Sequence, residues 1–197
     1  MKPLLIVVSA PSGAGKTTLC KRLLDERDDV VYSVSCTTRP PRGNEEDGKD
    51  YIFLSRETFE DKISRGCFLE CATVHGHYYG TLRKTVQDAM DLGLNVLMDI
   101  DVQGARKIRS VVERMPEDHP MRVGFFDIFI EPPSLEALRQ RLEARAEDAP
   151  EVIEKRVAQA QAEMEERHLY DECIVNDDLE QAYRRFKACI LAEMNLD

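Results

Sequence analysis

The sequence predicts an α/β fold, in which a core of parallel strands carries helices on both faces. An apolar run at residues 4–8 leads into a glycine-rich loop, and the segment after that loop has apolar residues at helical spacing. Short buried runs followed by amphipathic helices recur along the chain, which is typical of βα units around a parallel sheet.

Two segments interrupt this pattern, one rich in short strands and turns and one with two arginine-bearing helices. The length of 197 residues fits one compact domain. We therefore expect a single domain over residues 1–197, with a core at about 1–35, 83–140 and 160–197, an insert at about 36–82 and a helical segment at about 141–159.

Composition limits the partners and the compartment. The net charge is −10, from 27 Lys and Arg against 37 Asp and Glu, and a surface of that sign repels nucleic acids and acidic membranes. We therefore expect neither as a partner. The six cysteines show no CxxC pair and no other disulfide or zinc spacing, which favours reduced thiols in a cytoplasmic protein. The N-terminal apolar run is too short for a signal peptide, and no stretch has the length of a membrane span.

The stretch VVSAPSGAGKTT, from Val7 to Thr18, has the order strand, glycine loop, helix. Glycines let backbone N–H groups converge on an anion and the helix N-terminus adds positive charge, so the stretch predicts a phosphate-binding P-loop. Lys16 would reach the β- and γ-phosphates of a nucleotide, and Thr17 would offer its hydroxyl to Mg²⁺. Ala10 replaces the first glycine of the usual pattern, which the turn tolerates if φ is negative there. The alternative is an ordinary βα turn with a chance lysine.

After the first helix, residues 30–35 predict a strand, and the loop CTTRPPRGNEEDGKDY follows. Arg39 and Arg42 lie three residues apart in this loop, and the two prolines between them lower the entropic cost of fixing both guanidinium groups. This favours an anion-binding loop, and the alternative is a solvated, charged loop.

Next, residues 51–54 predict a short strand, and Ser55 predicts the N-cap of a helix that stops at Gly66. A strand at residues 67–74 then leads into a glycine-punctuated turn, HGHYYGT. Glu70 interrupts this otherwise apolar strand. Its carboxylate faces either solvent or a ligand, and periodicity does not distinguish the two.

The core pattern returns with a helix at residues 83–92 and a buried strand that ends in Asp99 and Asp101. The carboxyl ends of parallel strands line the ligand crevice, so both acids are placed to hold Mg²⁺ water or a substrate. For Asp101 the alternative, or an additional role, is a helix N-cap. The remaining expected elements are a polar loop at 115–121, a strand at 122–130, helices from Ser134 and from Pro150, a strand at 172–175 and a closing helix with Leu179, Tyr183, Phe186 and Ile190 on one face.

Arginines lie on both helices of the second interruption. Arg141 and Arg145 lie four residues apart on one helix face, and Arg156 lies near the start of the next helix. Two such helices joined by a short polar turn predict a lid. The alternative is surface salt bridging with neighbouring glutamates, which contributes little to stability.

These arginines narrow the reactions that a P-loop allows. A phosphate monoester acceptor is already ionised near neutral pH, so it needs no general base, and the main barrier is bringing two anions together. Guanidinium groups and Mg²⁺ lower that barrier by charge stabilisation and positioning. An enzyme of this kind should carry arginines on several segments and no catalytic His or Cys, and Arg39, Arg42, Arg141, Arg145 and Arg156 fit that expectation.

Seven stretches, in order, give the chain its resemblance to a known family: SAPSGAGKTT, SVSCTTRPPRGNEEDGKDYIF, FLE at residues 68–70, HYYGT at 77–81, LMDIDVQG, EPPSLEALRQRLEAR and IVNDDL. In their order and nearly in their spacing, they resemble the guanylate kinase family from end to end. The resemblance implies a P-loop nucleoside monophosphate kinase fold with a β-rich GMP-binding insert and a helical lid. It also implies Mg²⁺-dependent transfer of the γ-phosphoryl of ATP to GMP, and to dGMP, giving ADP and GDP.

The same resemblance implies the site residues. The GMP-binding residues would be Ser35, Arg39, Arg42, Glu45, Tyr51, Glu70, Tyr79, Thr81 and Asp101, with Glu70 and Asp101 on the base. The ATP-binding residues would be Ala10, Pro11, Ser12, Gly13, Ala14, Gly15, Lys16, Thr17, Thr18 and Asn176, the last near the adenine. The catalytic residues would be Lys16, Arg39, Arg141, Arg145 and Arg156, and Thr17 and Asp99 would hold Mg²⁺ directly or through water.

Two other functions stay open at this point. Guanylate-kinase-like domains of scaffold proteins bind peptides without catalysis, but they lack parts of the P-loop that this chain has. A kinase of the same fold that acts on a phosphorylated ribose would give Glu70 and the RPPR loop no purpose. The oligomeric state, monomer or homodimer, and the role of a stretch at about 111–122 that is longer than in compact members are also open.

Overall fold

A five-stranded sheet forms the core of the computed structural model, which describes residues 2–74, 76–144 and 149–195. Neighbouring strands are parallel, and the order is β2-β7-β1-β8-β9. Their bounds are β1 Leu5–Ser9, β2 Val30–Tyr32, β7 Asn95–Asp99, β8 Phe125–Glu131 and β9 Glu172–Val175. The strand before the glycine loop is central because its residues are apolar on both faces, which the buried position between β7 and β8 requires.

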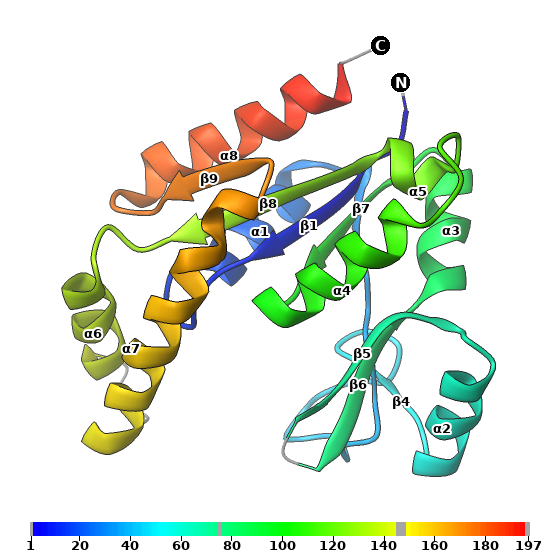
Figure 1. Cartoon of the computed structure of the whole chain (residues 1–197), viewed down its shortest axis with the longest axis horizontal. Coiled ribbons are helices and arrows are strands. Elements are labelled where there is room, and N and C mark those ends of the chain that lie inside the picture. Colours follow the sequence, from blue (N-terminus) through cyan, green and yellow to red (C-terminus); the bar gives the residue numbers. More distant parts are fainter. Residues whose placement is uncertain (1, 75, 145–148, 196–197) are drawn as a thin grey trace.

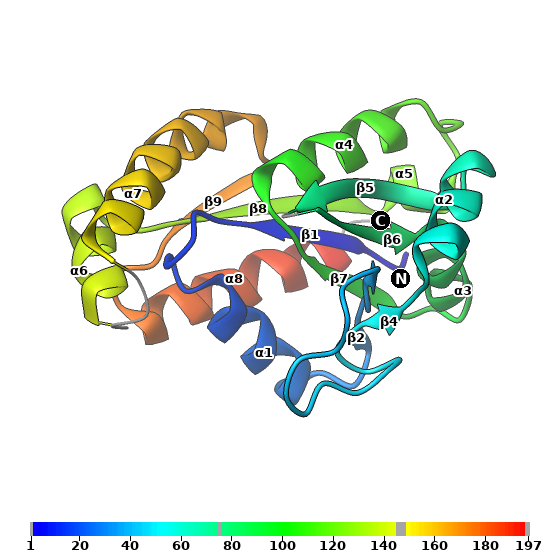
Figure 2. The ribbon, with the colours of Figure 1, turned by 90° about the horizontal axis from the view of Figure 1, so that it is seen from below.

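Helices cover both faces of this sheet (Figures 1 and 2). Ile6 and Val8 point into a core shared with α1 (Lys16–Glu26) and α8 (Leu179–Met194). Leu5 and Val7 point the other way, towards α3 (Arg83–Asp91) and α4 (Val102–Glu113). This alternation confirms the predicted α/β class with helices on both faces. None of the helices in the described ranges is both long enough and apolar enough to cross a bilayer.

A second, smaller sheet lies below one end of the core (Figure 1). Its order is β4-β3-β6-β5, with β3 Cys36–Thr37, β4 Ile52–Phe53, β5 Phe68–Val74 and β6 His77–Leu82. Helix α2 (Arg56–Ser64) packs on it through Phe59, whose ring stacks on that of Phe68 at 4.3 Å between centroids. Ser55 caps α2, as predicted, by accepting a hydrogen bond from the backbone N of Thr58.

The stretch HYYGT is a strand, so the prediction of a turn there is wrong. Gly80 suggested a turn, but it pairs with Cys71 inside the β5–β6 hairpin. A Cβ at Gly80 would lie 2.8 Å from the carbonyl oxygen of Glu70. The glycine is therefore needed for close approach of two backbones and not for a reversal of the chain.

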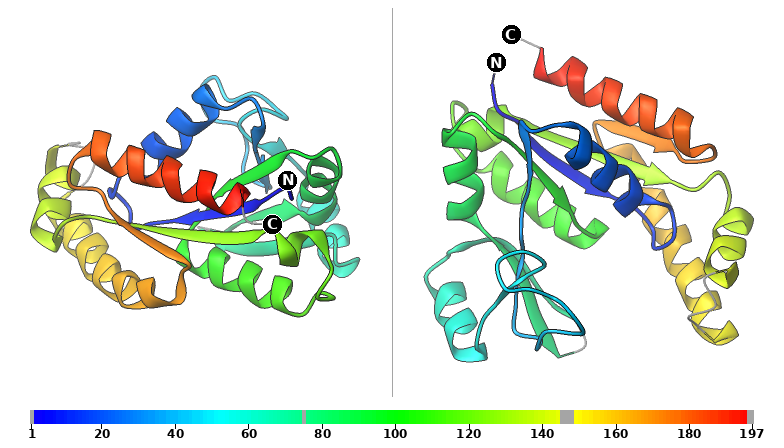
Figure 3. Two further views of the ribbon diagram at one scale, coloured as in Figure 1. Left: turned by 90° about the horizontal axis from the view of Figure 1, so that it is seen from above. Right: turned by 180° about the vertical axis from the view of Figure 1, so that it is seen from behind.

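The two arginine-bearing helices are α6 (Leu135–Ala144) and α7 (Pro150–Glu165), followed by the short helix η1 (Glu166–Leu169). They pack on each other through a small apolar cluster that includes Leu138, Leu142 and Ile153. The pair and the small sheet project from the same edge of the core, at opposite ends, in both the front and rear views (Figures 1 and 3). The glycine loop and the start of α4 lie between them.

Some element limits differ from the predicted ones. Strand β2 stops at Tyr32 and not at residue 35. Residues 115–121 are not all loop, because α5 (Pro120–Val123) begins there and delays β8 to Phe125. Proline at the first helical position and the imidazole of His119, which accepts from the backbone N of Met121 at 3.2 Å, explain this helix. In α8, Leu179 is the first residue of the helix and is exposed, whereas Tyr183, Phe186 and Ile190 are buried as predicted.

The turn between α5 and β8 suggests a test of the core. The carbonyl of Gly124 accepts from the backbone N of Leu5 at 2.8 Å, and a Cβ at Gly124 would lie 2.2 Å from the carbonyl oxygen of Pro3. We expect Gly124→Ala to lower the free energy of unfolding by about 2 kcal/mol, because the backbone at the start of β1 must shift. Urea denaturation measures this. The exposed neighbour gives the control, since Val123→Ala should stay within about 0.5 kcal/mol. Equal stability of the two variants would contradict this reading of the turn.

Candidate functional site

The glycine loop lines a cavity of about 370 Å³ at the carboxyl ends of β1 and β7. Gly13 and Gly15 both have φ of 94°, a left-handed backbone that favours glycine. Gly15 is also crowded, because a Cβ there would lie 2.2 Å from Nδ2 of Asn176. Ala10, in the place of the first glycine, is buried and joins the core cluster under the loop. The loop conformation therefore requires glycine at positions 13 and 15 but not at position 10.

Asn176, from the far end of the chain, supports this loop from behind. Its buried amide Nδ2 donates to the carbonyl of Ala14 at 2.7 Å. Its own backbone carbonyl accepts from Nη2 of Arg141 on α6 at 2.8 Å. Asn176 thus connects the loop to the helical pair, and contact with an adenine stays a prediction.

The N-terminus of α1 contacts the end of β7 through Lys16, Thr17 and Asp99. The ammonium of Lys16 forms an ion pair with Asp99 and donates to the carbonyl of Ile100 at 2.6 Å. The hydroxyl of Thr17 donates to Oδ2 of Asp99 at 3.1 Å. A hydroxyl and a carboxylate are the hard oxygen donors that Mg²⁺ takes alongside phosphate and water oxygens. Within the described ranges no three His, Cys, Asp or Glu side chains gather as a metal site.

A second cavity, of about 280 Å³, lies between the small sheet and the core. Five of the residues that line it are predicted GMP-binding residues: Ser35, Tyr51, Glu70, Tyr79 and Asp101. Asp99 and Asp101 line both this cavity and the one at the glycine loop. The two cavities therefore meet at the end of β7, so a molecule bound in one would lie next to a molecule bound in the other.

Glu70 and Asp101, the two predicted base-binding carboxylates that line this second cavity, have different hydrogen-bond partners. Glu70 accepts from the Thr81 hydroxyl at 3.2 Å, and burial raises its pKa above the ordinary value. Oδ1 of Asp101 accepts from the backbone N of Gly104 at 2.7 Å, so the residue is the N-cap of α4. The cap that we gave as an alternative is confirmed, and the same residue also lines both cavities.

Arg39 and Arg42 differ although they share one loop. Arg39 is 5% exposed, donates twice to Glu45 at 2.9 and 2.8 Å, and donates to the Tyr79 hydroxyl at 3.2 Å. Its guanidinium also lies 5.2 Å from the ring centroid of Tyr51. Arg42 is exposed, and its backbone N donates to Glu45 at 2.7 Å. Arg39 is thus held in place, and Glu45 holds both the side chain of Arg39 and the backbone of Arg42.

The helical pair contacts the glycine loop directly through Arg156 and indirectly through Asn176. Arg141 contacts Asn176, as described, and Nη1 of Arg156 lies 3.5 Å from the Ser12 hydroxyl. The predicted catalytic residue Arg145 lies outside the described residues. Surface pairing is also present between the two helices, where Arg139 on α6 pairs with Glu154 on α7.

Two residues of α7, Gln159 and Glu163, also line the glycine-loop cavity and were not predicted. Burial raises the pKa of Glu163, while the charge of Lys16 lowers it. Both follow Arg156 at spacings that place them on the same helix face, so helical periodicity from Arg156 was the available signal. Tyr32 and Asp50, which line the second cavity, had no such signal.

Comparison with known proteins identifies the family. The family model described as guanylate kinase matches residues 2–193. The chain belongs to the guanylate kinase family. This confirms the predicted resemblance and the enzyme class that it implied, an ATP-dependent kinase of GMP.

Relatives and a solved structure agree with the family. A guanylate kinase of Symbiobacterium thermophilum is 47% identical over 192 residues, covering 98% of this chain and 86% of that protein. One from Nitrosomonas europaea is 46% identical over 189 residues, covering 96% and 89%. The crystal structure of guanylate kinase from Anaplasma phagocytophilum matches with a TM-score of 0.73 and 35% identity, covering 98% of this chain and 87% of that one.

The contact behind the glycine loop is open to test. We expect Asn176→Ala to lower the free energy of unfolding by about 1 to 2 kcal/mol, because the buried carbonyl of Ala14 loses its donor. The loosened loop should also raise the KM for ATP by roughly tenfold, which corresponds to about 1.4 kcal/mol of binding energy. Steady-state kinetics at saturating acceptor measures the second effect. Asp177→Ala changes an exposed neighbour and should alter neither quantity. An unchanged KM for ATP in Asn176→Ala would show that the loop keeps its shape without this support.

Proposed function

We propose that this chain transfers the γ-phosphoryl group of ATP to GMP, giving ADP and GDP, with ATP at the glycine loop and GMP in the second cavity. One observation supports this more than any other: the two cavities share Asp99 and Asp101. A donor phosphate in one and an acceptor phosphate in the other would meet there, which is the arrangement that direct in-line transfer needs.

On the donor side, we assign the triphosphate to Lys16 and to the backbone N–H groups of residues 10–18, with Asn176 supporting the loop. Thr17 and Asp99 would hold Mg²⁺, directly or through water, because they already offer adjacent oxygens 3.1 Å apart. When bound, the ion supplies positive charge to the phosphate oxygens. Lys16 would then exchange part of its contact with Asp99 for the transferring phosphoryl group.

On the acceptor side, we assign the GMP phosphate to Arg39, Arg42, Tyr51 and Tyr79 and the base to Glu70 and Asp101. Ser35, Thr81 and Glu45 complete this proposed set. A carboxylate accepts from guanine N1–H and from its exocyclic amine, whereas adenine offers an acceptor at N1. Such a site can reject the wrong base by as much as roughly 10⁴-fold. No residue in this set is assigned to the 2′-hydroxyl, so we include dGMP among the acceptors.

The chemical step then needs cations and no base. The acceptor phosphate is ionised near neutral pH, and its oxygen can attack directly. Lys16, Arg39, Arg141, Arg145 and Arg156 would spread over the two phosphates and lower their repulsion, as preorganised donors do for developing charge. Glu45 would position Arg39 before the substrate arrives, because it already takes two of the five donors of that guanidinium.

This function gives the segments their roles. We propose residues 36–82 as a GMP-binding insert and 141–159 as a lid, both closing on a core at about 1–35, 83–140 and 160–197 once the two nucleotides are bound. We also propose a cytoplasmic location, which the six unpaired thiols support because a reducing compartment keeps cysteines in that state.

An acceptor panel tests the proposed function. ADP release is measured with GMP, dGMP, AMP, CMP and UMP, and we expect GMP and dGMP to be used far faster than the other three. Lys16→Ala should lower kcat by roughly 10² or more, because the main cation on the donor phosphates is lost. Equal turnover of GMP and AMP would refute the proposal, and full activity of Lys16→Ala would return a non-catalytic binding role to consideration.

The protonation of Glu70 gives a pH prediction. Only the ionised carboxylate accepts from guanine, so affinity is full above the pKa of Glu70 and is lost as pH falls through it. Burial raises that pKa above the ordinary value of 4.5 for a glutamate. As the pH is lowered, we therefore expect the KM for GMP to begin to rise at a higher pH than an exposed glutamate would give. The phosphate of GMP itself takes a proton at a pH of about 6, so Glu70→Gln supplies the baseline. That variant should have a flatter profile and a weaker preference for GMP over AMP. Identical profiles for the two proteins would remove Glu70 from base recognition.

A further inference from the structure

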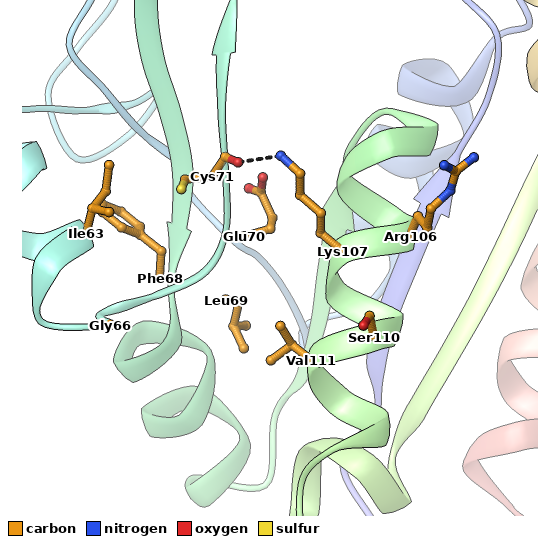
Figure 4. Close-up of a pocket in the computed structure, with 10 residues that line it drawn as sticks. All are labelled: Ile63, Gly66, Phe68, Leu69, Glu70, Cys71, Arg106, Lys107, Ser110 and Val111. Carbon is orange, nitrogen blue, oxygen red and sulfur yellow. Dashed lines mark hydrogen bonds between the residues drawn. The ribbon is translucent and has the colours of Figure 1, made fainter.

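A third cavity, of about 510 Å³, separates the small sheet from helix α4 (Figure 4). Its apolar wall includes Phe68 and Leu69 on the sheet side and Val111 on the helix side. Glu70 lines it as well as the second cavity, so this carboxylate lies in the wall between the two. Strand β5, which carries Glu70, therefore faces α4 across the third cavity.

Lys107 spans it. The side chain leaves α4, and its ammonium donates to the carbonyl of Cys71 on β5 at 2.6 Å, the contact drawn as a dashed line in Figure 4. Cys71 follows Glu70 directly in the chain. Strand β5 lies at the edge of its sheet and pairs only with β6 among the described strands. Lys107 thus holds the far side of the strand that carries Glu70.

The backbone around Glu70 is irregular, so it needs such support. The pairing register of β5 with β6 shifts between Phe68 and Glu70, where a β-bulge adds Leu69. A bulge re-aims the side chains beside it and leaves the strand locally less constrained. The bulge and the contact of Lys107 lie on the two sides of Glu70, one before it and one after it.

The positive charge of Lys107 also supports Glu70 as an acceptor, because it favours the ionised carboxylate. Burial and the negative charge of Asp101 raise the pKa of Glu70, whereas Lys107 and the hydroxyl of Thr81 lower it. Asp101 caps helix α4, and the same helix carries Lys107. One helix therefore holds both Asp101 and the lysine that contacts the strand of Glu70. The other titratable groups that line the second cavity are Tyr32, Asp50, Tyr51, Tyr79 and Asp99.

We propose that Lys107 is a positioning residue for base recognition: its bond to the Cys71 carbonyl sets Glu70 at a fixed place relative to Asp101. This inference rests on the proposed function, because it requires that Glu70 reads guanine. Lys107 is exposed and touches no predicted substrate group, so it acts through Glu70 and the strand and not on the reacting atoms.

The test compares Lys107→Met, which keeps the length of the side chain but removes its charge and donor, with the wild type. We expect the KM for GMP to rise about tenfold, while the KM for ATP and the thermal midpoint stay unchanged. Lys107→Arg should recover most of the loss, because it can still donate to Cys71. Arg106→Met is the matched control: it removes the same charge from the same helix and cavity, but Arg106 pairs with Glu166 and not with β5. Its KM for GMP should stay within about twofold of the wild type.

A double-mutant cycle decides whether Lys107 acts through Glu70. In a Glu70→Gln background, Lys107→Met should add no further loss of GMP over AMP preference, because the group that it positions is already neutral. If Glu70→Gln loses that preference but Lys107→Met leaves the KM for GMP unchanged, or adds its full effect in the double variant, this inference is overturned and the proposed function stands. If Glu70→Gln keeps full preference for GMP, the assignment of Glu70 and this inference fall together.

Discussion

Repulsion between two phosphate groups is the constraint around which this molecule is built, and the chain itself adds a net charge of −10. Cations at the site must therefore be both numerous and fixed. Lys16 is held by Asp99, Arg39 by Glu45, and Arg141 by the carbonyl of Asn176. Each contact pre-orders a flexible side chain and so reduces the entropy lost when substrate binds. In the proposed function the same contacts would compete with phosphate, so substrate would replace part of what each acceptor oxygen provides.

The core could be predicted from sequence because its signals are strong and local. Strand β1 is a continuous apolar run that precedes two positive-φ glycines. Helices α2 and α4 begin at Ser55 and Asp101, whose side chains cap them and are typical N-cap residues. Prediction was weaker where one residue type occurs in two kinds of structure. Gly80 could mark a turn or a close backbone approach, and only the pairing of β5 with β6 decides between them.

The candidate site shows the same division. The glycine loop, Glu70 and Asp101 could be found from motif and position, and the family resemblance supplied the rest of the predicted set. What sequence could not supply was which groups touch across long separations. Asn176 lies 162 residues from Ala14, whose carbonyl it contacts. Such contacts follow from the packing of whole elements, which local periodicity does not encode.

Asp101 combines a helix cap with its proposed role in base recognition, and this combination would limit how base preference can evolve. It begins helix α4 through Gly104 and also lines both cavities. A mutational route towards another acceptor base that passes through Asp101 would disturb the helix start, at about 1 kcal/mol, together with the wall that the two cavities share. Glu70 carries no helix cap and lies on the small sheet, so selection can change it more freely. If Glu70 and Asp101 bind the base as proposed, the evolutionary freedom to choose a base is concentrated on the smaller sheet, because Asp101 on the core is also needed for folding.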